Sequence, residues 1–225
     1  MTTFLILEKH MQSYMKCLAA VSLAVSCQVA QAGVIVQATA ISASHPDFGG
    51  SYALVNQINQ SGLSAGYVAG VTDFDSFVAS TTHDGLAALN SGFSVGPFGS
   101  FSYDLGAVYN IDSIGLWATD NTGSVLNFNL YADSDNDFSN GNSGLLGGFT
   151  ALGSNYTTAD PGQAFTFGDV STRYVHMEIL TTDGGAQPGL GEVVFRTATV
   201  VPEPEPLALF AAGLIPVCLR LRRKA

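Results

Sequence analysis

The central region of this 225-residue chain lacks cysteine, because Cys17, Cys27 and Cys218 all lie close to one end or the other. A disulfide framework is therefore excluded there, and a hydrophobic core has to hold the region together. The chain also lacks the G-x-S-x-G, H-E-x-x-H, G-x-G-x-x-G and Walker patterns of common enzyme classes. We therefore predict that the protein is not an enzyme and assign no catalytic residue.

Basic residues are scarce, with 8 Lys and Arg against 18 Asp and Glu and a net charge of −10. Between residues 33 and 201 only Arg173 and Arg196 remain against fifteen acidic residues, which gives that region a formal charge of −13. Such a surface repels phosphate backbones, so the composition excludes nucleic acid as a partner. Divalent cations are its natural counter-ions.

Long hydrophobic runs are absent, and the apolar segment at 207–219 has only 13 residues. As a helix it extends about 20 Å, against a hydrocarbon core of about 30 Å. The proline-rich VPEPEP at 201–206 precedes it as an extended spacer, and four basic residues follow it, Arg220, Arg222, Arg223 and Lys224. Basic residues after an apolar span fit the cytoplasmic side of a membrane; a buried terminal helix of the domain is the alternative.

These three parts in this order resemble the PEP-CTERM sorting signal of Gram-negative bacteria. Val201, Pro202, Glu203 and Pro204 match its motif, and the arginines match its basic end. The resemblance implies a transient membrane helix at 207–219 and recognition by an exosortase-type membrane protease. It also implies a destination at the cell surface or in the extracellular matrix. A second Pro-Glu-Pro at 204–206 leaves the register open, and cleavage or retention of the tail stays open too.

The N-terminal segment has the features of a secretory signal peptide. Met15 and Lys16 open a positive start, an apolar stretch follows, and Ala30 and Ala32 fit an A-x-A site for signal peptidase before Gly33. Translation starting at Met11 or Met15 would remove the unusual first residues, and acylation of Cys27 is the alternative. We therefore predict a signal peptide at 1–32, one domain at 33–197 and a sorting tail at 198–225.

The domain shows an all-β pattern of short alternating apolar runs separated by Gly, Asn, Ser and Thr. In RYVHMEIL, Val175, Met177 and Ile179 alternate with Tyr174, His176 and Glu178, and LNFNLYAD alternates in the same way. We predict an antiparallel two-sheet sandwich. The segment ALVNQINQSGL remains open between a helical turn and a loop.

The order of the strands brings a second resemblance, to discoidin or coagulation-factor type C domains, which are galactose-binding-like jelly rolls. The matching fragments are Asp104-Leu105-Gly106, Ile111 to Ile114, Arg173-Tyr174-Val175 and Gly189 to Val193. The resemblance implies a jelly-roll sandwich that binds ligands through the loops at one end. The tryptophan that the family often has after its first variable loop is missing, so no ligand residue is transferred from the family.

Acidic loops are the candidates for a metal site. Asp133, Asp135 and Asp137 alternate after a predicted strand and can present oxygen ligands to Ca²⁺, although the loop departs from an EF-hand. A solvated acidic turn explains the run equally well. A looser group in a second loop contains Asp73, Asp75, His83 and Asp84.

Aromatic residues are the candidates for sugar binding, by stacking on the apolar face of a ring; the same side chains can instead be core packing. They are Tyr52, Tyr67, Phe74, Phe77, Tyr109 and Trp117. Glu178, Glu192 and His176 are interpreted as strand positions without a catalytic role.

Two functions remain. The first is an exported surface or matrix protein whose β-sandwich binds carbohydrate, with exopolysaccharide as the expected ligand. The alternative is a non-catalytic structural protein of the surface or biofilm matrix, stabilised by calcium and without a small ligand.

Overall fold

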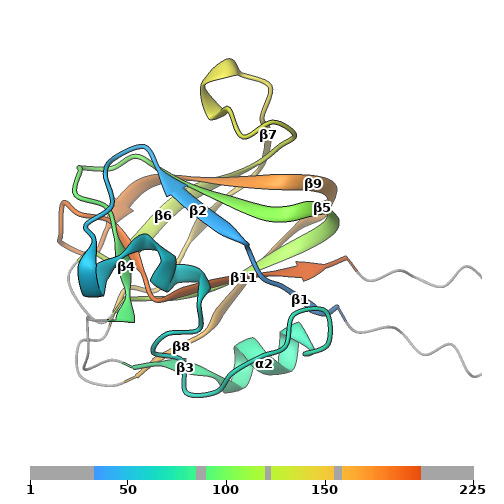
Figure 1. The fold of residues 1–225 in the computed structure, drawn as a ribbon, viewed down its shortest axis with the longest axis horizontal. Coiled ribbons are helices and arrows are strands. Elements are labelled where there is room, and N and C mark those ends of the chain that lie inside the picture. Colours follow the sequence, from blue (N-terminus) through green and yellow to red (C-terminus); the bar gives the residue numbers. More distant parts are fainter. Residues whose placement is uncertain (1–32, 85–89, 120–122, 155–158, 199–225) are drawn as a thin grey trace, which may run out of the picture. The chain divides into compact units, whose positions relative to one another are not determined.

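A computed structural model describes residues 33–84, 90–119, 123–154 and 159–198 (Figure 1). The predicted signal peptide with Ala30 and Ala32, the sorting motif at 201–204, the apolar segment and the basic end lie outside the described residues, so these predictions stay predictions. Within the described part, no helix combines the length and apolar character that crossing a membrane requires.

Antiparallel strands dominate this part of the chain, which confirms the predicted all-β class. Short 3₁₀ helices and one α-helix, α2 (Phe74–Ser80), interrupt them. The 3₁₀ helix η2 (Leu54–Ile58) shows that the segment left open is a helical turn. The strands are β1 (Ile35–Val36), β2 (Ala40–Ala43), β3 (Thr82–His83), β4 (Gly92–Phe93), β5 (Ser100–Trp117), β6 (Val125–Asp133), β7 (Gly144–Thr150), β8 (Asp160–Pro161), β9 (Gln163–Thr182), β10 (Gly189–Leu190) and β11 (Glu192–Thr197).

The two layers of the sandwich share their central strands, because β5 and β9 are long enough to pass through both. Their first pairing runs from Ser100 opposite Glu178 to Asp104 opposite Tyr174, and this half carries β2 on one side and β6 with β7 on the other. After a register shift beyond Asp104, the second half of β5 pairs with β11, and β11 pairs with β1. The bend lies at the end of the sandwich where β1 begins (Figure 1).

The main core fills the space between the layers. Val175, Met177 and Ile179 of β9 point into it, as the alternation predicted, together with Phe128 and Leu130 of β6. A register shift at the start of β6 takes Leu126 out of this row and leaves it half-buried. The core therefore follows the predicted period of two, except where a bulge changes the face.

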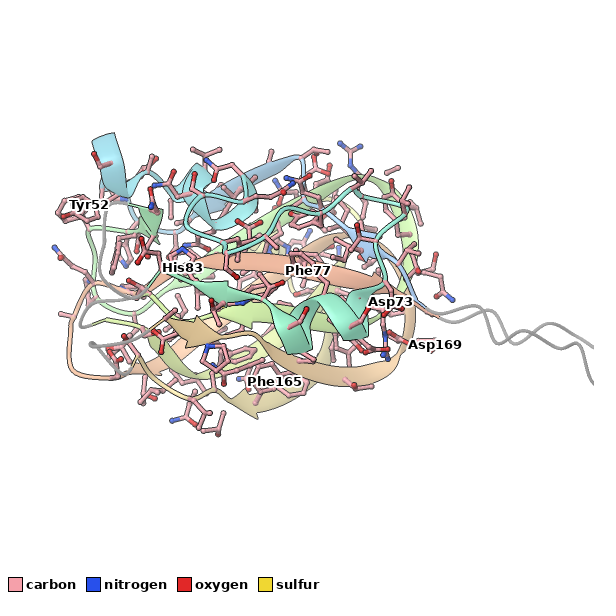
Figure 2. The ribbon with its side chains drawn as sticks, turned by 90° about the horizontal axis from the view of Figure 1, so that it is seen from below. Tyr52, Asp73, Phe77, His83, Phe165 and Asp169 are labelled. Atoms are coloured by element: carbon pink, nitrogen blue, oxygen red, sulfur yellow. The ribbon has the colours of Figure 1, made fainter. Side chains whose placement is uncertain are left out.

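A second, smaller core lies under helix α2 (Phe74–Ser80), on the outer side of the β11 layer (Figures 1 and 2). Trp117 is fully buried here, with its indole N–H donating to the carbonyl of Thr81 at 2.9 Å. Three further predicted loop aromatics, Tyr67, Phe74 and Phe77, pack around it. Of the two roles left open for these residues, core packing is the one that the structure shows, because the helix covers this face of the sheet.

Two fragments of the discoidin resemblance meet in space. Arg173 donates from Nε and Nη2 to the two oxygens of Asp104, at 2.8 and 2.9 Å. Gly106, two residues further on, has a φ of 81°, a conformation that favours glycine. The Asp-Leu-Gly fragment therefore ends one half of β5 and anchors it to β9 before the bend.

Candidate binding site

The end of the sandwich opposite the β5/β9 bend is built by the loops around η1 (Gly50–Tyr52) and β4 (Figure 1). The segment before η1 pairs with the segment after β4: the N–H of Phe48 donates to the carbonyl of Phe93 at 3.1 Å, and that of Val95 to the carbonyl of Pro46 at 3.0 Å. These bonds tie two loops that are distant in sequence into one surface.

Asp47 shapes the turn that begins this surface. Its Oδ1 accepts hydrogen bonds from the N–H groups of Gly49 and Leu54, at 2.9 and 3.0 Å. Gly49 and Gly50 both have positive φ, of 78° and 59°, which side chains with a Cβ rarely adopt. The sequence DFGG therefore forms a tight turn that presents Phe48 on one side and starts η1 on the other.

Aromatic side chains gather on this turn. The rings of Phe48 and Tyr52 meet edge to face with centroids 5.4 Å apart, and Tyr52 meets Phe93 in the same way at 6.0 Å. Phe48 is 45% exposed and Phe98, from the neighbouring loop, is 47% exposed. Figure 2 places Tyr52 at the extreme tip of this end. We call Phe48, Tyr52, Phe93 and Phe98 the aromatic end.

A groove of about 490 Å³ lies beside the turn that carries Phe48. Strand β2 forms one wall and η2 the other, and His45, Pro46 and Asp47 line the part that adjoins Phe48. The His45 ring is fixed from two sides, since its Nε2 lies 3.3 Å from the carbonyl of Phe98 and a Cβ at Gly96 would overlap the ring. The surface thus combines exposed rings with a few oriented polar groups, as small-ligand sites do.

Of the predicted candidates, only Tyr52 belongs to the aromatic end. Tyr109 is 37% exposed but lies on β5 beyond Asp104, in the bend at the other end of the sandwich. Phe48 and Phe98 were missed by the sequence reasoning. The available signal was their setting in DFGG and GPFG, where an aromatic residue stands in a turn and not in an alternating strand.

The acidic run begins at Asp133, the last residue of β6, and most of its side-chain hydrogen bonds stay within the loop that follows. Asp133 is buried and accepts from the N–H of Ser134 at 2.6 Å, Asp135 accepts from Asn140 at 3.0 Å, and Asp137 accepts from the N–H of Ser139 at 3.1 Å. Over the described ranges, no three His, Cys, Asp or Glu side chains gather as they would around a metal ion. Calcium binding by this loop stays a proposal, which a calcium-dependent rise in melting temperature would support.

The looser acidic group does not form a site. Asp73 caps the N-terminus of α2 by accepting from the N–H of Ser76 at 2.9 Å, and Asp75 pairs with Arg196 at 2.8 Å. His83 is buried, with its Nε2 3.1 Å from the carbonyl of Ser61. Burial lowers the pKa of this imidazole, against the opposing effect of nearby backbone and acidic groups.

The two glutamates have separate hydrogen-bond networks. Glu178 lies on the outer face of β9, where Asn129 and Tyr131 donate to its Oε2 at 2.9 and 3.0 Å. Glu192 is fully buried at the start of β11 and accepts from Tyr67 and from the N–H of Gln60. Both carboxylates therefore have structural partners.

No protein-family model matches this chain, and no curated protein matches it. Solved structures of similar fold include the family 32 carbohydrate-binding modules of Clostridium perfringens ZmpB. One chain, with two such modules and an M60 catalytic domain, has a TM-score of 0.52 and 12% identity over 73% of this chain. A two-module structure in complex with GalNAc has a TM-score of 0.50 and 12% identity over 72%. This protein spans only 15% and 35% of those chains, and the likeness establishes the fold.

Proposed function

We propose that the domain binds carbohydrate through the aromatic end. The exposed ring of Phe48, held against Tyr52 by a turn with two positive-φ glycines, is the observation that supports this most directly. Aromatic rings present a large, rigid apolar surface beside polar groups, which suits the alternating C–H and hydroxyl faces of a sugar. His45 and Asp47 lie beside the rings and supply hydrogen-bonding groups.

The experiment is affinity electrophoresis of the full chain through gels that contain polysaccharides, followed by calorimetry with the monosaccharides of any that retard it. GalNAc is the first monosaccharide to test, because one structure of similar fold holds it. Exopolysaccharide from the native host is the first polymer. Saturable retardation by at least one glycan supports the proposal. Unchanged mobility in every gel would favour the structural alternative.

We infer in addition that the protein is exported and sorted by its terminal segments, with signal peptidase and an exosortase-type protease as partners. The support is the sequence alone: the A-x-A site at Ala30 to Ala32, and the ordered spacer, apolar segment and basic end after residue 200. Carbohydrate binding would then take place at the cell surface or in the matrix.

Intact mass of the protein from native membrane and matrix fractions tests this second proposal separately. A species that begins at Gly33 and ends between Val201 and Pro204 supports export and tail processing. A membrane species that retains Ala225 would show a permanent anchor and contradict sorting by cleavage. Neither result depends on whether a sugar binds.

A further inference from the structure

The outer face of the sheet half formed by β2, β5, β9, β6 and β7 carries a serine, a histidine and an aspartate that are linked by hydrogen bonds. The hydroxyl of Ser102 lies 2.7 Å from Nδ1 of His176, its direct neighbour across the β5/β9 pairing. Nε2 of the same imidazole lies 3.2 Å from Oδ2 of Asp133, at the end of β6. Three strands thus contribute one residue each to a linear hydrogen-bond chain.

The proton positions in this chain follow from its last member. A carboxylate oxygen accepts hydrogen bonds, so we assign the imidazole hydrogen to Nε2 of His176, which donates it to Asp133. Nδ1 is then the lone-pair nitrogen and accepts the hydrogen of the Ser102 hydroxyl. This is the protonation state in which an imidazole can take a proton from a serine while a carboxylate stabilises the resulting cation.

Within this hydrogen-bond chain, the side chains of Asp133 and His176 are held rigidly. Oδ1 of Asp133 accepts from the N–H of Ser134, which leaves Oδ2 directed at the imidazole. Phe138, in the short helix η4 (Phe138–Asn140), stacks on the His176 ring with centroids 4.9 Å apart and planes inclined by 26°. The imidazole and the aspartate side chain are fully buried under this cover.

Ser102 itself is accessible. It is partly exposed, and its neighbour across the other pairing is the exposed Ser42 of the edge strand β2. Along β5 the adjacent residues on the same face, Ser100 and Asp104, are partly exposed too. The serine is therefore approached from the side of β2, where its neighbour Ser42 has a short side chain, whereas His176 and Asp133 lie behind it.

We propose that Ser102 is a nucleophile activated by His176 and Asp133, and that it accepts acyl groups from small carboxylic esters. The Ser102 oxygen forms a bond to the ester carbonyl carbon while its proton passes to Nδ1 of His176. The bond to the alcohol oxygen then breaks, and the proton on Nδ1 passes to that oxygen. A water molecule repeats both transfers on the acylated serine and releases the carboxylic acid. The site is separate from the aromatic end and does not depend on sugar binding.

The direct test is covalent labelling of the full-length protein with a small alkyl fluorophosphonate, which forms a stable adduct only with activated serines. Peptide mapping by mass spectrometry should find the adduct on Ser102. Ser102→Ala should lose it, and Ser42→Ala, which changes the neighbouring serine on the same face, should keep it. In parallel, hydrolysis of p-nitrophenyl acetate should fall to the buffer rate in Ser102→Ala. Labelling of Ser42 and Ser102 at equal rates would overturn the proposal.

A second measurement decides the case in which the phosphonate is too bulky to reach Ser102 on the sheet surface. It also leaves the buried His176 in place. In Ser102→Cys the same base should convert the thiol to a thiolate. We expect iodoacetamide to alkylate it at least about tenfold faster near pH 6.5 than the thiol of Ser42→Cys, a modest fraction of what a positioned base contributes. Peptide mapping separates both from Cys17, Cys27 and Cys218. An equal alkylation rate together with no phosphonate adduct would show that the three residues are only a structural hydrogen-bond chain.

Discussion

The hydroxyl of Tyr67 donates to Oε1 of Glu192 at 3.0 Å, although neither side chain has more than a small fraction of its surface in contact with solvent. Burial raises the pKa of Glu192 to about 8, against the opposing effect of the hydrogen bonds from Gln60 and Tyr67. Burial, and the negative charge of Glu192, raise the pKa of the Tyr67 phenol as well. A carboxyl group in the core thus depends on the 59–67 loop for its partners.

Stability should therefore fall as pH rises from about 4.5 to about 8. The folded protein retains the proton on Glu192 over this range while the unfolded chain releases it, so rising pH favours unfolding. Each pKa unit corresponds to about 1.4 kcal/mol, so the change should amount to a few kcal/mol. Urea unfolding between pH 4.5 and 8.5 measures it. Glu192→Gln should flatten the dependence, and Glu178→Gln, which leaves Glu192 in place, should not.

The two arginines of the domain should contribute unequally to stability. Arg196 is 16% exposed and binds Asp112, which is 9% exposed, whereas Arg173 and Asp104 are 41% and 21% exposed. Arg196→Met should cost about 3 kcal/mol, because Asp112 loses a buried partner. Arg173→Met should cost about 1 kcal/mol or less, because water replaces much of the lost interaction. Equal losses in urea unfolding would contradict this difference.

Removal of the exposed ring of Phe48 or the half-buried ring of Tyr52 should weaken glycan binding without unfolding the domain. Phe48→Ala and Tyr52→Ala should each raise the dissociation constant about tenfold, equivalent to about 1.4 kcal/mol. Tyr109→Ala is the matched control, because that ring has comparable exposure at the opposite end of the sandwich. Calorimetry with the retarding glycan measures all three. Equal weakening by Tyr109→Ala would move the site away from the aromatic end.

Asp73, the capping residue of α2, should contribute to stability through its side-chain oxygen alone. Asp73→Ala should cost about 1 kcal/mol, because the N–H of Ser76 loses its acceptor. Asp73→Asn retains an acceptor and should lose much less. Thermal unfolding of the two variants measures this difference in stability. Identical melting temperatures for Asp73→Ala and Asp73→Asn would show that Phe74 and Phe77 hold α2 without help from the cap.

The faces of the strands were predictable because they depend on neighbouring residues only. Val175, Met177 and Ile179 are buried as their alternation required. Helix α2 was visible in principle, since Asp73 precedes apolar residues at 74, 77 and 78, but the acidic residues led to its interpretation as a loop. A short amphipathic helix is therefore hard to recognise in a sequence that otherwise shows an alternating β pattern.

Other features depend on contacts between distant segments. His176 occupies an outward position on β9 and is nevertheless buried, because Phe138 from another loop covers it. No local pattern specifies that cover. The sequence pattern also does not reveal that β5 and β9 pass through both layers. Alternation indicates which face of a strand a residue occupies, but not which layer the strand belongs to.

Strand β11 ends at the side of the sandwich opposite the aromatic rings, and this placement sets the direction in which a pull on that strand would act (Figure 1). A pull between the end of β11 and a ligand on the far loops acts along the strand and not across it. The hydrogen bonds from Glu192 to Thr197 against β5 would then bear the force together, in shear. Bonds loaded together in this way resist the separation of β11 from β5 far better than bonds that open one after another.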